Sequence, residues 1–262
     1  MANMTSSVLA SQVAGELASA TFEEIPALVE HYREDPRQQV IKACERALKR
    51  HAKELAERER VNDMYELMHE LGGDGVVVGV DEVGRGSVAG PLTVCAVCLP
   101  MEPRVWGIND SKKLTPARRE LLSVKIAEVA TAIGFCHIAP KDIDEMGMAR
   151  AIRTAVAGAV ADTGLEPDCV LMDGNPLGAV PNERDVVKGD AKIACIAAAS
   201  IMAKVTRDEM MVEYDAEYPE YHLAESKGYA SPEHIEAIRK HGLCPLHRVS
   251  FCGNFLQTER LF

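Results

Sequence analysis

Acidic side chains follow three apolar runs of the sequence, and these carboxylates are the groups best suited to chemistry. They are Asp81 and Glu82 after VVVGV, Asp173 after CVLM, and Asp190 at the end of DVVKGD. A single acid at the end of a strand is usually a turn former or a helix cap, and Asp190 alone fits that description. Three apolar runs that each end in acid instead indicate a shared site.

If the three runs are neighbouring strands of one sheet, their ends bring four carboxylates together. Four negative groups cannot all stay ionised at close quarters without compensation, which divalent cations supply. Ligation by carboxylates alone favours Mg²⁺ or Mn²⁺ over zinc. Two such ions about 3.5 to 4 Å apart suit in-line displacement at a phosphodiester. The pattern therefore predicts phosphodiester hydrolysis.

Asp81 and Glu82 are adjacent, and adjacent side chains on a regular strand point to opposite faces of the sheet. We therefore expect the strand to end or to bulge at these residues. The following Gly84-Arg85-Gly86 favours such a change, because glycines permit unusual backbone angles and let a polynucleotide approach the main chain. On its own, this short motif is weak evidence.

Strand-like and helical patterns alternate from about residue 75 onward, which predicts an α/β fold. Thr115-Pro116 and Ser231-Pro232 each carry the signature of a helix start, and Gly242 should end the second helix. Asp190 is expected to open a long helix rich in alanine. The expected strands cover 76–83, 92–99, 134–138, 169–173 and part of 185–190, and a helix rich in small residues should end near 164.

Residues 1–70 contain no strand-like run and predict a helical extension in front of a catalytic domain at 71–262. The segment 36–60 holds eight Lys or Arg against four Glu, whereas 1–35 holds one Arg against six acids. A solvated helix with charge pairs four residues apart is the ordinary interpretation. An arm that lies along a nucleic acid backbone is the alternative.

The formal net charge of −11 is the wrong sign for holding nucleic acid by overall charge, so such binding needs a local basic patch. The eight cysteines are scattered, mostly in apolar runs, which predicts reduced thiols rather than disulfides. Cys95 and Cys98 have the spacing of half a zinc site, but no second half exists. No apolar run approaches the ~20 residues that span a bilayer, and a soluble cytoplasmic protein is expected.

Taken together, the motifs resemble those of the bacterial ribonuclease HII family, the type 2 ribonucleases H. The resemblance covers about residues 75–255 and, as a set, its motifs are highly specific. It implies a ribonuclease H-like mixed central sheet flanked by helices, after a helical N-terminal extension. The motifs are GVDEVGRGSVAGP at 79–91, NDSKKL at 109–114, MDG at 172–174, VVKGDAKIACIAAASIMAKVTRD at 186–208, KGY at 227–229 and HRVSF at 247–251.

The resemblance also implies roles for individual residues. It makes the four carboxylates metal ligands, the Gly84-Arg85-Gly86 loop the reader of the ribose 2′-hydroxyl, and Tyr229 the ring at the step from ribonucleotide to deoxyribonucleotide. The 2′-hydroxyl is the group that distinguishes RNA from DNA at one nucleotide. Expected phosphate or strand contacts are Ser111, Lys112, Lys113, Ser200, Lys204 and Arg207. For each cation among them, a solvated surface charge is the alternative.

The implied activity is cleavage 5′ to a ribonucleotide in duplex DNA and of RNA in RNA/DNA hybrids, with Mg²⁺ or Mn²⁺. The products would be a 3′-hydroxyl and a 5′-phosphate. Three alternatives are another nuclease or transposase of the same fold, a catalytically silent nucleic-acid-binding protein, and a phosphatase acting on small molecules. The tail Gln257–Phe262 loosely resembles peptides that dock on DNA sliding clamps, although packing of Leu261 and Phe262 on the domain is the simpler expectation.

Overall fold

The computed structural model describes residues 8–256, so the C-terminal tail lies outside the described residues and its docking role stays a prediction. The chain divides into two compact units, Met1–Asn62 and Asp63–Phe262. The boundary falls within the long helix α3, Gln38–Gly72, which the sequence analysis placed wholly or nearly wholly in the extension. Each unit is described by itself below.

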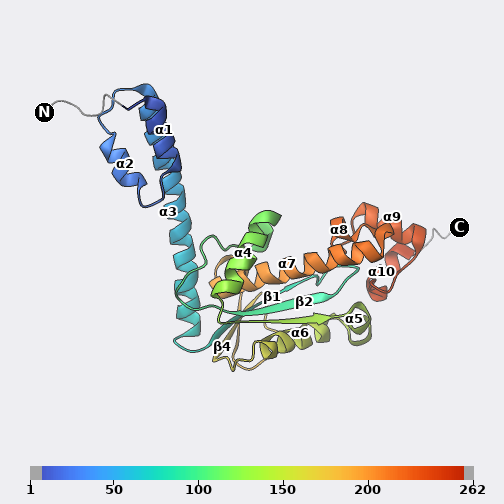
Figure 1. The fold of residues 1–262 in the computed structure, drawn as a ribbon. Coiled ribbons are helices and arrows are strands. Elements are labelled where there is room, and N and C mark those ends of the chain that lie inside the picture. The colour runs from blue at the N-terminus through green and yellow to red at the C-terminus, as the bar shows by residue number, and fades with distance from the viewer. Residues whose placement is uncertain (1–7, 257–262) are drawn as a thin grey trace. The chain divides into compact units, whose positions relative to one another are not determined.

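The first unit is helical, as expected. It contains α1 (Ala10–Ser19), α2 (Ile25–His31) and the first part of α3, and Figure 1 shows the two short helices alongside α3. Its small core is buried completely at Val13, Ile25 and Val40. Arg50 on α3 donates hydrogen bonds to the carbonyls of Leu17, Ala18 and Ala20 at the end of α1. These bonds satisfy carbonyls that a helix end otherwise leaves unpaired.

The second unit is built on a five-stranded mixed sheet in the order β3-β2-β1-β4-β5. The β1–β2 and β2–β3 pairs are antiparallel, and the β1–β4 and β4–β5 pairs are parallel. This confirms the α/β class and the mixed sheet. The strands are β1 (Val77–Val83), β2 (Leu92–Cys98), β3 (Ala132–Ile138), β4 (Cys169–Asp173) and β5 (Glu183–Val186).

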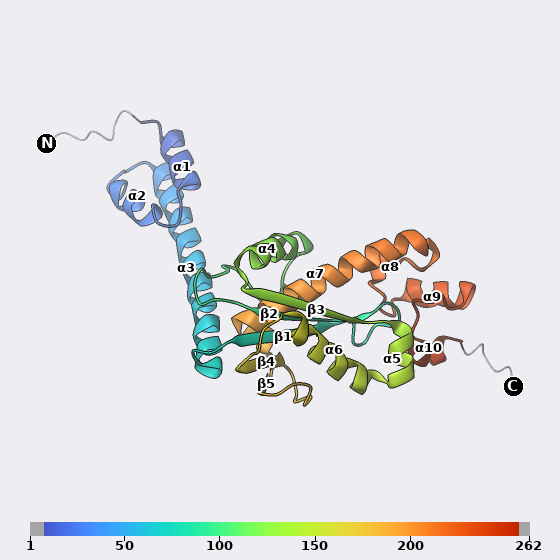
Figure 2. The ribbon, with the colours of Figure 1, turned by 60° about the horizontal axis from the view of Figure 1, so that its bottom comes forward.

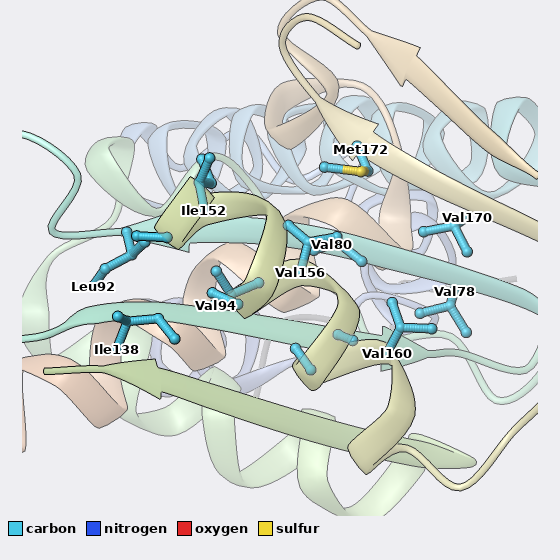
Figure 3. Close-up of a cluster of buried hydrophobic side chains, with 14 of the residues drawn as sticks. Val78, Val80, Leu92, Val94, Ile138, Ile152, Val156, Val160, Val170 and Met172 are labelled. Atoms are coloured by element: carbon cyan, nitrogen blue, oxygen red, sulfur yellow. The ribbon is translucent and has the colours of Figure 1, made fainter. Parts of the chain in front are cut away.

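Helices cover both faces of this sheet (Figure 2). On one face, α6 (Met148–Asp162) packs its apolar side on β1, β2 and β4 to form the main core, with α5 (Pro140–Met146) before it. Figure 3 shows Val156 of this helix beside Val80 and Val94 of the sheet. On the opposite face lie α4 (Pro116–Val129) and the long α7 (Ala194–Glu217).

The close approach of α7 to the sheet explains the small residues in both elements. A Cβ on Gly79 would lie 2.3 Å from the backbone carbon of Cys195, so β1 must carry a glycine there. The alanines Ala197, Ala198 and Ala199 of α7 are fully buried. Because Gly79 faces α7, alternation along the strand directs Asp81 to the same face and Glu82 to the other.

Several element boundaries follow the sequence signals. Thr115 accepts a hydrogen bond from the Arg118 amide at the start of α4, and Ser231 accepts one from the His234 amide at the start of α9 (Pro232–His241). The prediction that Asp190 opens the long helix is wrong. It lies in a separate 3-10 turn, η3 (Gly189–Ala191), and α7 begins only at Ala194.

The C-terminal part of the second unit forms a second, smaller core. Here α8 (Leu223–Ser226), α9 and α10 (Val249–Leu256) pack with the C-terminal part of α7. They also pack with Val88 and Ala89 of the glycine-rich loop, residues 84–91. All eight cysteines are free, as expected. Among the described residues, no helix is long and apolar enough to cross a membrane.

Candidate active site

The first two acids lie on a continuous strand, so the expected strand end or bulge at Asp81 and Glu82 is wrong. β1 stays in register with β2 through Asp81↔Cys95 and Glu82↔Val94. Its parallel pairing with β4 instead stops at Val80↔Met172. The two acids therefore follow the point where β1 and β4 separate, and their side chains leave the strand on opposite faces.

The other two acids reach this point from β4 and from the turn before α7. Asp173 is the last residue of β4, and its Oδ1 accepts a hydrogen bond of 2.7 Å from the Gly189 amide. That bond fixes the short turn that carries Asp190, which is only 7% exposed. The structure thus brings the acids of three separate elements to one end of the sheet, as the sequence pattern requires for a shared site.

The electrostatics of these acids show how tightly they are grouped. Burial, with smaller contributions from Glu82 and Asp173, raises the pKa of Asp81 to about 8, although a hydrogen bond from Ser200 opposes the rise. Burial also raises the pKa of Glu82, against the opposing effect of Arg85. The pKa of Asp190 is raised by burial and then by Asp173 and Asp110. Negative charge in this site needs compensation that the acids cannot give one another.

The donor set fits a hard divalent cation. Carboxylate oxygens are the ligands that Mg²⁺ and Mn²⁺ prefer, and a cation would offset the burial and the repulsion that raise these pKa values. In the described part of the chain, no three His, Cys, Asp or Glu side chains are close enough to form a closed metal cage. The four acids therefore lie at the same end of the sheet, but no three of their carboxylates surround a single metal position.

A lysine and two serines complete the surroundings of the acids. Burial alone would lower the pKa of Lys112, but the attraction of Asp190, Asp81, Asp110 and Asp173 together raises it. The hydroxyl groups of Ser111 and Ser200 lie 2.9 Å apart and connect the SKK turn η2 (Ser111–Lys113) to α7. Lys112 is thus an exposed cation beside the carboxylates, and Ser200 positions Asp81.

Comparison with known proteins connects this geometry to one family. Residues 78–254 match the family model described as Ribonuclease HII, and residues 11–71 match the Ribonuclease HII N-terminal domain. A curated ribonuclease HII from Acetivibrio thermocellus is 40% identical over 259 residues, which cover 98% of this chain and 100% of the relative. One from Moorella thermoacetica is 47% identical over 198 residues, covering 74% of this chain and 96% of that protein.

The chain belongs to the ribonuclease HII family. Its relatives indicate a nuclease enzyme of the ribonuclease H class. The crystal structure of ribonuclease H2 from Pyrococcus horikoshii matches with a TM-score of 0.59 at 27% identity, covering 70% of this chain and 99% of that one. Ribonuclease HII of Archaeoglobus fulgidus, solved in a complex with PCNA, has the same fold, with a TM-score of 0.59, 24% identity, and coverage of 71% and 98%.

The residues that the sequence predicts to read the substrate lie on two neighbouring segments of this ribonuclease HII-family chain. Gly84 begins a tight turn in which Ser87 donates hydrogen bonds to its carbonyl from both its amide and its hydroxyl. Arg85 and Gly86 form the exposed tip of this turn, and Arg85 also pairs with Glu82 at 3.5 Å. Tyr229 is 39% exposed and directly follows Gly228, whose carbonyl accepts bonds from the Val88 and Ala89 amides.

The expected contact role of Arg207 is contradicted. This side chain is fully buried, and its guanidinium donates hydrogen bonds to protein oxygens rather than facing solvent. Arg207 follows Ser200 by seven residues and Lys204 by three along α7, but this spacing cannot show that the loop at Ala89 and Pro91 covers Arg207. Lys204 pairs with Asp208 at 2.7 Å, whereas Lys113 is exposed and remains a candidate phosphate contact.

Two contributors to this ribonuclease HII-family site were missed in the sequence. Asp110 acts electrostatically on Asp190 and Lys112, and its carboxylate also accepts a hydrogen bond from the Lys112 amide at 2.9 Å. Arg248 is fully buried behind the glycine-rich loop. Its position within HRVSF at 247–251 was the available signal, but the motif says nothing about which main-chain atoms the side chain binds.

Proposed function

We propose that this chain hydrolyses the phosphodiester on the 5′ side of a ribonucleotide in duplex DNA, and RNA strands in RNA/DNA hybrids, leaving a 3′-hydroxyl and a 5′-phosphate. The observation that carries the proposal is the convergence of Asp81, Glu82, Asp173 and Asp190 at the end of one sheet, where burial disfavours the negative charge of Asp81, Glu82 and Asp190. Family membership supports the same reaction class. This activity would remove ribonucleotides from DNA.

The four carboxylates would hold Mg²⁺ or Mn²⁺, which supplies, when bound, a more acidic water and charge neutralisation at the phosphate. Ser200 holds Asp81 through its hydroxyl, and the Gly189 amide holds Asp173. Lys112 lies beside the acids as an exposed cation that suits a phosphate oxygen of the substrate. The exposed turn at Arg85 and Gly86 offers main-chain groups to a ribose, and the ring of Tyr229 offers a flat apolar surface.

A duplex with one ribonucleotide, incubated with Mg²⁺, with Mn²⁺ and with a chelator, tests the proposal. We expect a single cut 5′ to the ribonucleotide with metal and none with the chelator. An all-DNA duplex of the same sequence is the control and should stay intact. Cutting of the control would favour another nuclease of this fold, and binding without any cutting would favour a silent binding protein.

Tyr229→Ala is expected to raise the KM for a single-ribonucleotide duplex by about ten-fold, because one stacked ring contributes about 1–3 kcal/mol to nucleic acid binding. The turnover number should change less, since the ring does not contact the carboxylates. Steady-state kinetics on single-ribonucleotide and hybrid duplexes measure this. A Tyr229→Ala enzyme with unchanged kinetics would contradict the assigned role.

The N-terminal unit presents a narrower basic surface than its sequence suggested. Several of its arginines already bind groups within the unit. Arg37 forms an ion pair with Asp35, and Arg50 donates a hydrogen bond to the Ala18 carbonyl at the end of α1. The exposed cations that remain on α3, none of them in an ion pair among the described residues, are Lys42, Arg46, Lys49 and Lys53. Their spacing of four, three and four residues puts them on one helical face over about 16 Å. We propose that this stripe contacts substrate backbone.

Replacing these four cations with Gln should weaken duplex binding and reduce the slope of log affinity against log salt by up to about 3.6, since each phosphate contact contributes about 0.9. Binding titrations at several salt concentrations measure the slope. The control neutralises the same number of exposed cations in the second unit, Lys125, Lys141, Arg239 and Lys240. Equal slopes for the stripe variant and the unchanged enzyme would leave the extension only a structural or partner role.

A further inference from the structure

Two buried arginines lie behind the glycine-rich loop, Gly84–Pro91, and neither has a part in the chemistry described above. Arg207 and Arg248 are each 0% exposed, and they are the two largest fully buried side chains of the described residues. Arg207 comes from α7 and Arg248 from the residue just before α10. Two cationic side chains from distant parts of the sequence therefore meet the same loop.

Arg207 connects the loop to the segment that carries Tyr229. Its Nε donates to the Pro91 carbonyl at 2.9 Å, and its Nη2 donates to the Ser87 hydroxyl at 2.8 Å and the Ala89 carbonyl at 3.0 Å. Its Nη1 donates to the Lys227 carbonyl at 2.8 Å. The guanidinium carbon also lies 5.8 Å from the centre of the Tyr229 ring, within range of a cation–π contact.

Arg248 binds the main chain of the same loop. Nε and Nη2 both donate to the Gly90 carbonyl, at 3.1 and 2.9 Å, and Nη1 donates to the Arg85 carbonyl at 3.2 Å. The Arg248 amide donates to the Val88 carbonyl at 2.8 Å. The loop's carbonyls at residues 85, 88, 89, 90 and 91 thus all accept hydrogen bonds from the two buried arginines, while Arg85 and Gly86 remain exposed at the tip.

Glycines make this packing around Arg207 possible. A Cβ on Gly84 would lie 2.3 Å from Arg207 Nε, and one on Gly228 would lie 2.2 Å from the Ala89 carbonyl oxygen. Both glycines also have positive φ, at 84° and 76°. The loop and the Gly228-Tyr229 segment therefore approach each other more closely than any side chain would allow.

Burying two arginines without a carboxylate partner among the described residues does not favour the stability of the fold. A buried charge is usually paired with an opposite charge, yet all seven hydrogen bonds of these guanidiniums go to carbonyl or hydroxyl oxygens. Burial, then repulsion from Arg207, lowers the pKa of Arg248 to about 10, so it remains charged at neutral pH. Positive charge is consequently held behind the loop of a protein whose net charge is −11.

We propose that Arg207 and Arg248 are positioning residues that hold the glycine-rich loop and Tyr229 as one rigid surface for reading the ribonucleotide, with their charge favouring the adjacent phosphate. The inference rests on the proposed function, because it assigns the loop and Tyr229 to substrate reading. It also gives the local positive charge that nucleic acid binding requires from an acidic protein. Neither arginine contacts the substrate.

Arg207→Lys tests the proposal, because a lysine has three donors in place of the planar fork and cannot span the same four acceptors. We expect kcat/KM on a single-ribonucleotide duplex to fall by at least about ten-fold, mainly through KM. The Mn²⁺ concentration for half-maximal activity should stay the same, since the carboxylates are on other elements. Arg248→Lys should behave alike, and Ser87→Ala, which removes one acceptor of Arg207, should show a smaller effect in the same direction.

A loss of stability alone must be distinguished from a loss of positioning. Val156→Ala in the core under α6 is the control, as it weakens packing away from the loop, and all assays are run well below each variant's melting temperature. It should leave KM unchanged. If the arginine variants do not fold, Ser87→Ala, measured in the same way, decides the matter, and an unchanged KM for it would overturn the proposal.

A double-mutant cycle between Arg207 and Tyr229 gives the sharper result. If Arg207 acts through Tyr229 and the loop, Arg207→Lys should lower kcat/KM by less than about three-fold in a Tyr229→Ala background, because coupled residues are not additive. Additive effects, or an unchanged KM for Arg207→Lys in the otherwise unchanged enzyme, would contradict the inference. Failure of the proposed function is recognised separately, since the unchanged enzyme would then not cut the single-ribonucleotide duplex.

Discussion

Asp173→Asn is expected to lower cleavage of a single-ribonucleotide duplex by at least about a thousand-fold, or about 4 kcal/mol in the activation free energy. The charge of Asp173 helps to raise the pKa of each of the other three acids, Asp81, Glu82 and Asp190. Replacing its carboxylate by an amide removes a negative charge from the cation site but keeps nearly the same shape. The loss should therefore affect metal binding and turnover rather than the fold.

Three measurements check this expectation. Turnover is measured at saturating Mg²⁺ and Mn²⁺, Mn²⁺ affinity is measured by calorimetry without substrate, and stability is measured by thermal melting. Asp185→Asn is the matched control, because Asp185 is an exposed acid on β5, beside Met172 in the sheet register. The control should keep full activity and full Mn²⁺ affinity. Near-normal turnover by Asp173→Asn would show that the acid cluster is not the catalytic site.

Asp81→Asn should lower turnover as much as Asp173→Asn does, but it should not lower the stability of the metal-free enzyme. Asp81 is half-buried beside other acids, so its charge opposes folding when no cation compensates it. In the presence of a chelator, the melting temperature of Asp81→Asn should therefore equal or exceed that of the unchanged enzyme. A marked decrease would mean that Asp81 stabilises the fold and that its loss of activity is not a matter of metal charge.

The grouping of the acids could be predicted from the sequence because two local signals indicated the same place. Apolar runs identified β1 and β4, and the acids that follow these runs, Asp81, Glu82 and Asp173, identified the end of the sheet at which the cluster lies. Helix starts such as Thr115-Pro116 were equally clear, since the cap hydrogen bond depends on neighbouring residues. The prediction for Asp190 was wrong because an acid before a long helix resembles a helix cap. Its turn is instead fixed by the hydrogen bond from the Gly189 amide to Asp173, which is distant in sequence.

Burial of charged residues could not be predicted in the same way. Arg207 follows Lys204 by three residues, and nothing local distinguishes a buried arginine from a solvated lysine. The difference arises from tertiary contacts with Pro91 and Lys227, which are far away along the chain. Likewise, the strand continues through Asp81 and Glu82 because β2 pairs with it throughout, and single-strand patterns do not contain that information.

The two glycines of the GRG turn should respond very differently to the same substitution. Gly84 has φ of 84°, and an added Cβ would lie 2.3 Å from Arg207 Nε and 2.8 Å from the Pro91 carbonyl oxygen. Gly86 has no heavy atom within 4 Å of the same position among the described residues, and its φ is not in the left-handed region. Backbone strain and overpacking together cost about 2–4 kcal/mol at Gly84.

Gly84→Ala is therefore expected to lower the melting temperature by at least about 5 °C, and to lower cleavage because the turn and Arg207 both shift. Gly86→Ala should melt within about 1 °C of the unchanged enzyme, since a surface change away from special features is nearly neutral. Its methyl group would nevertheless stand at the exposed tip, where a ribose must approach the main chain. We expect KM for a single-ribonucleotide duplex to rise in Gly86→Ala while stability is kept. Unchanged kinetics in Gly86→Ala would place the substrate away from this turn, and equal melting of the two variants would contradict the packing of Gly84 on Arg207.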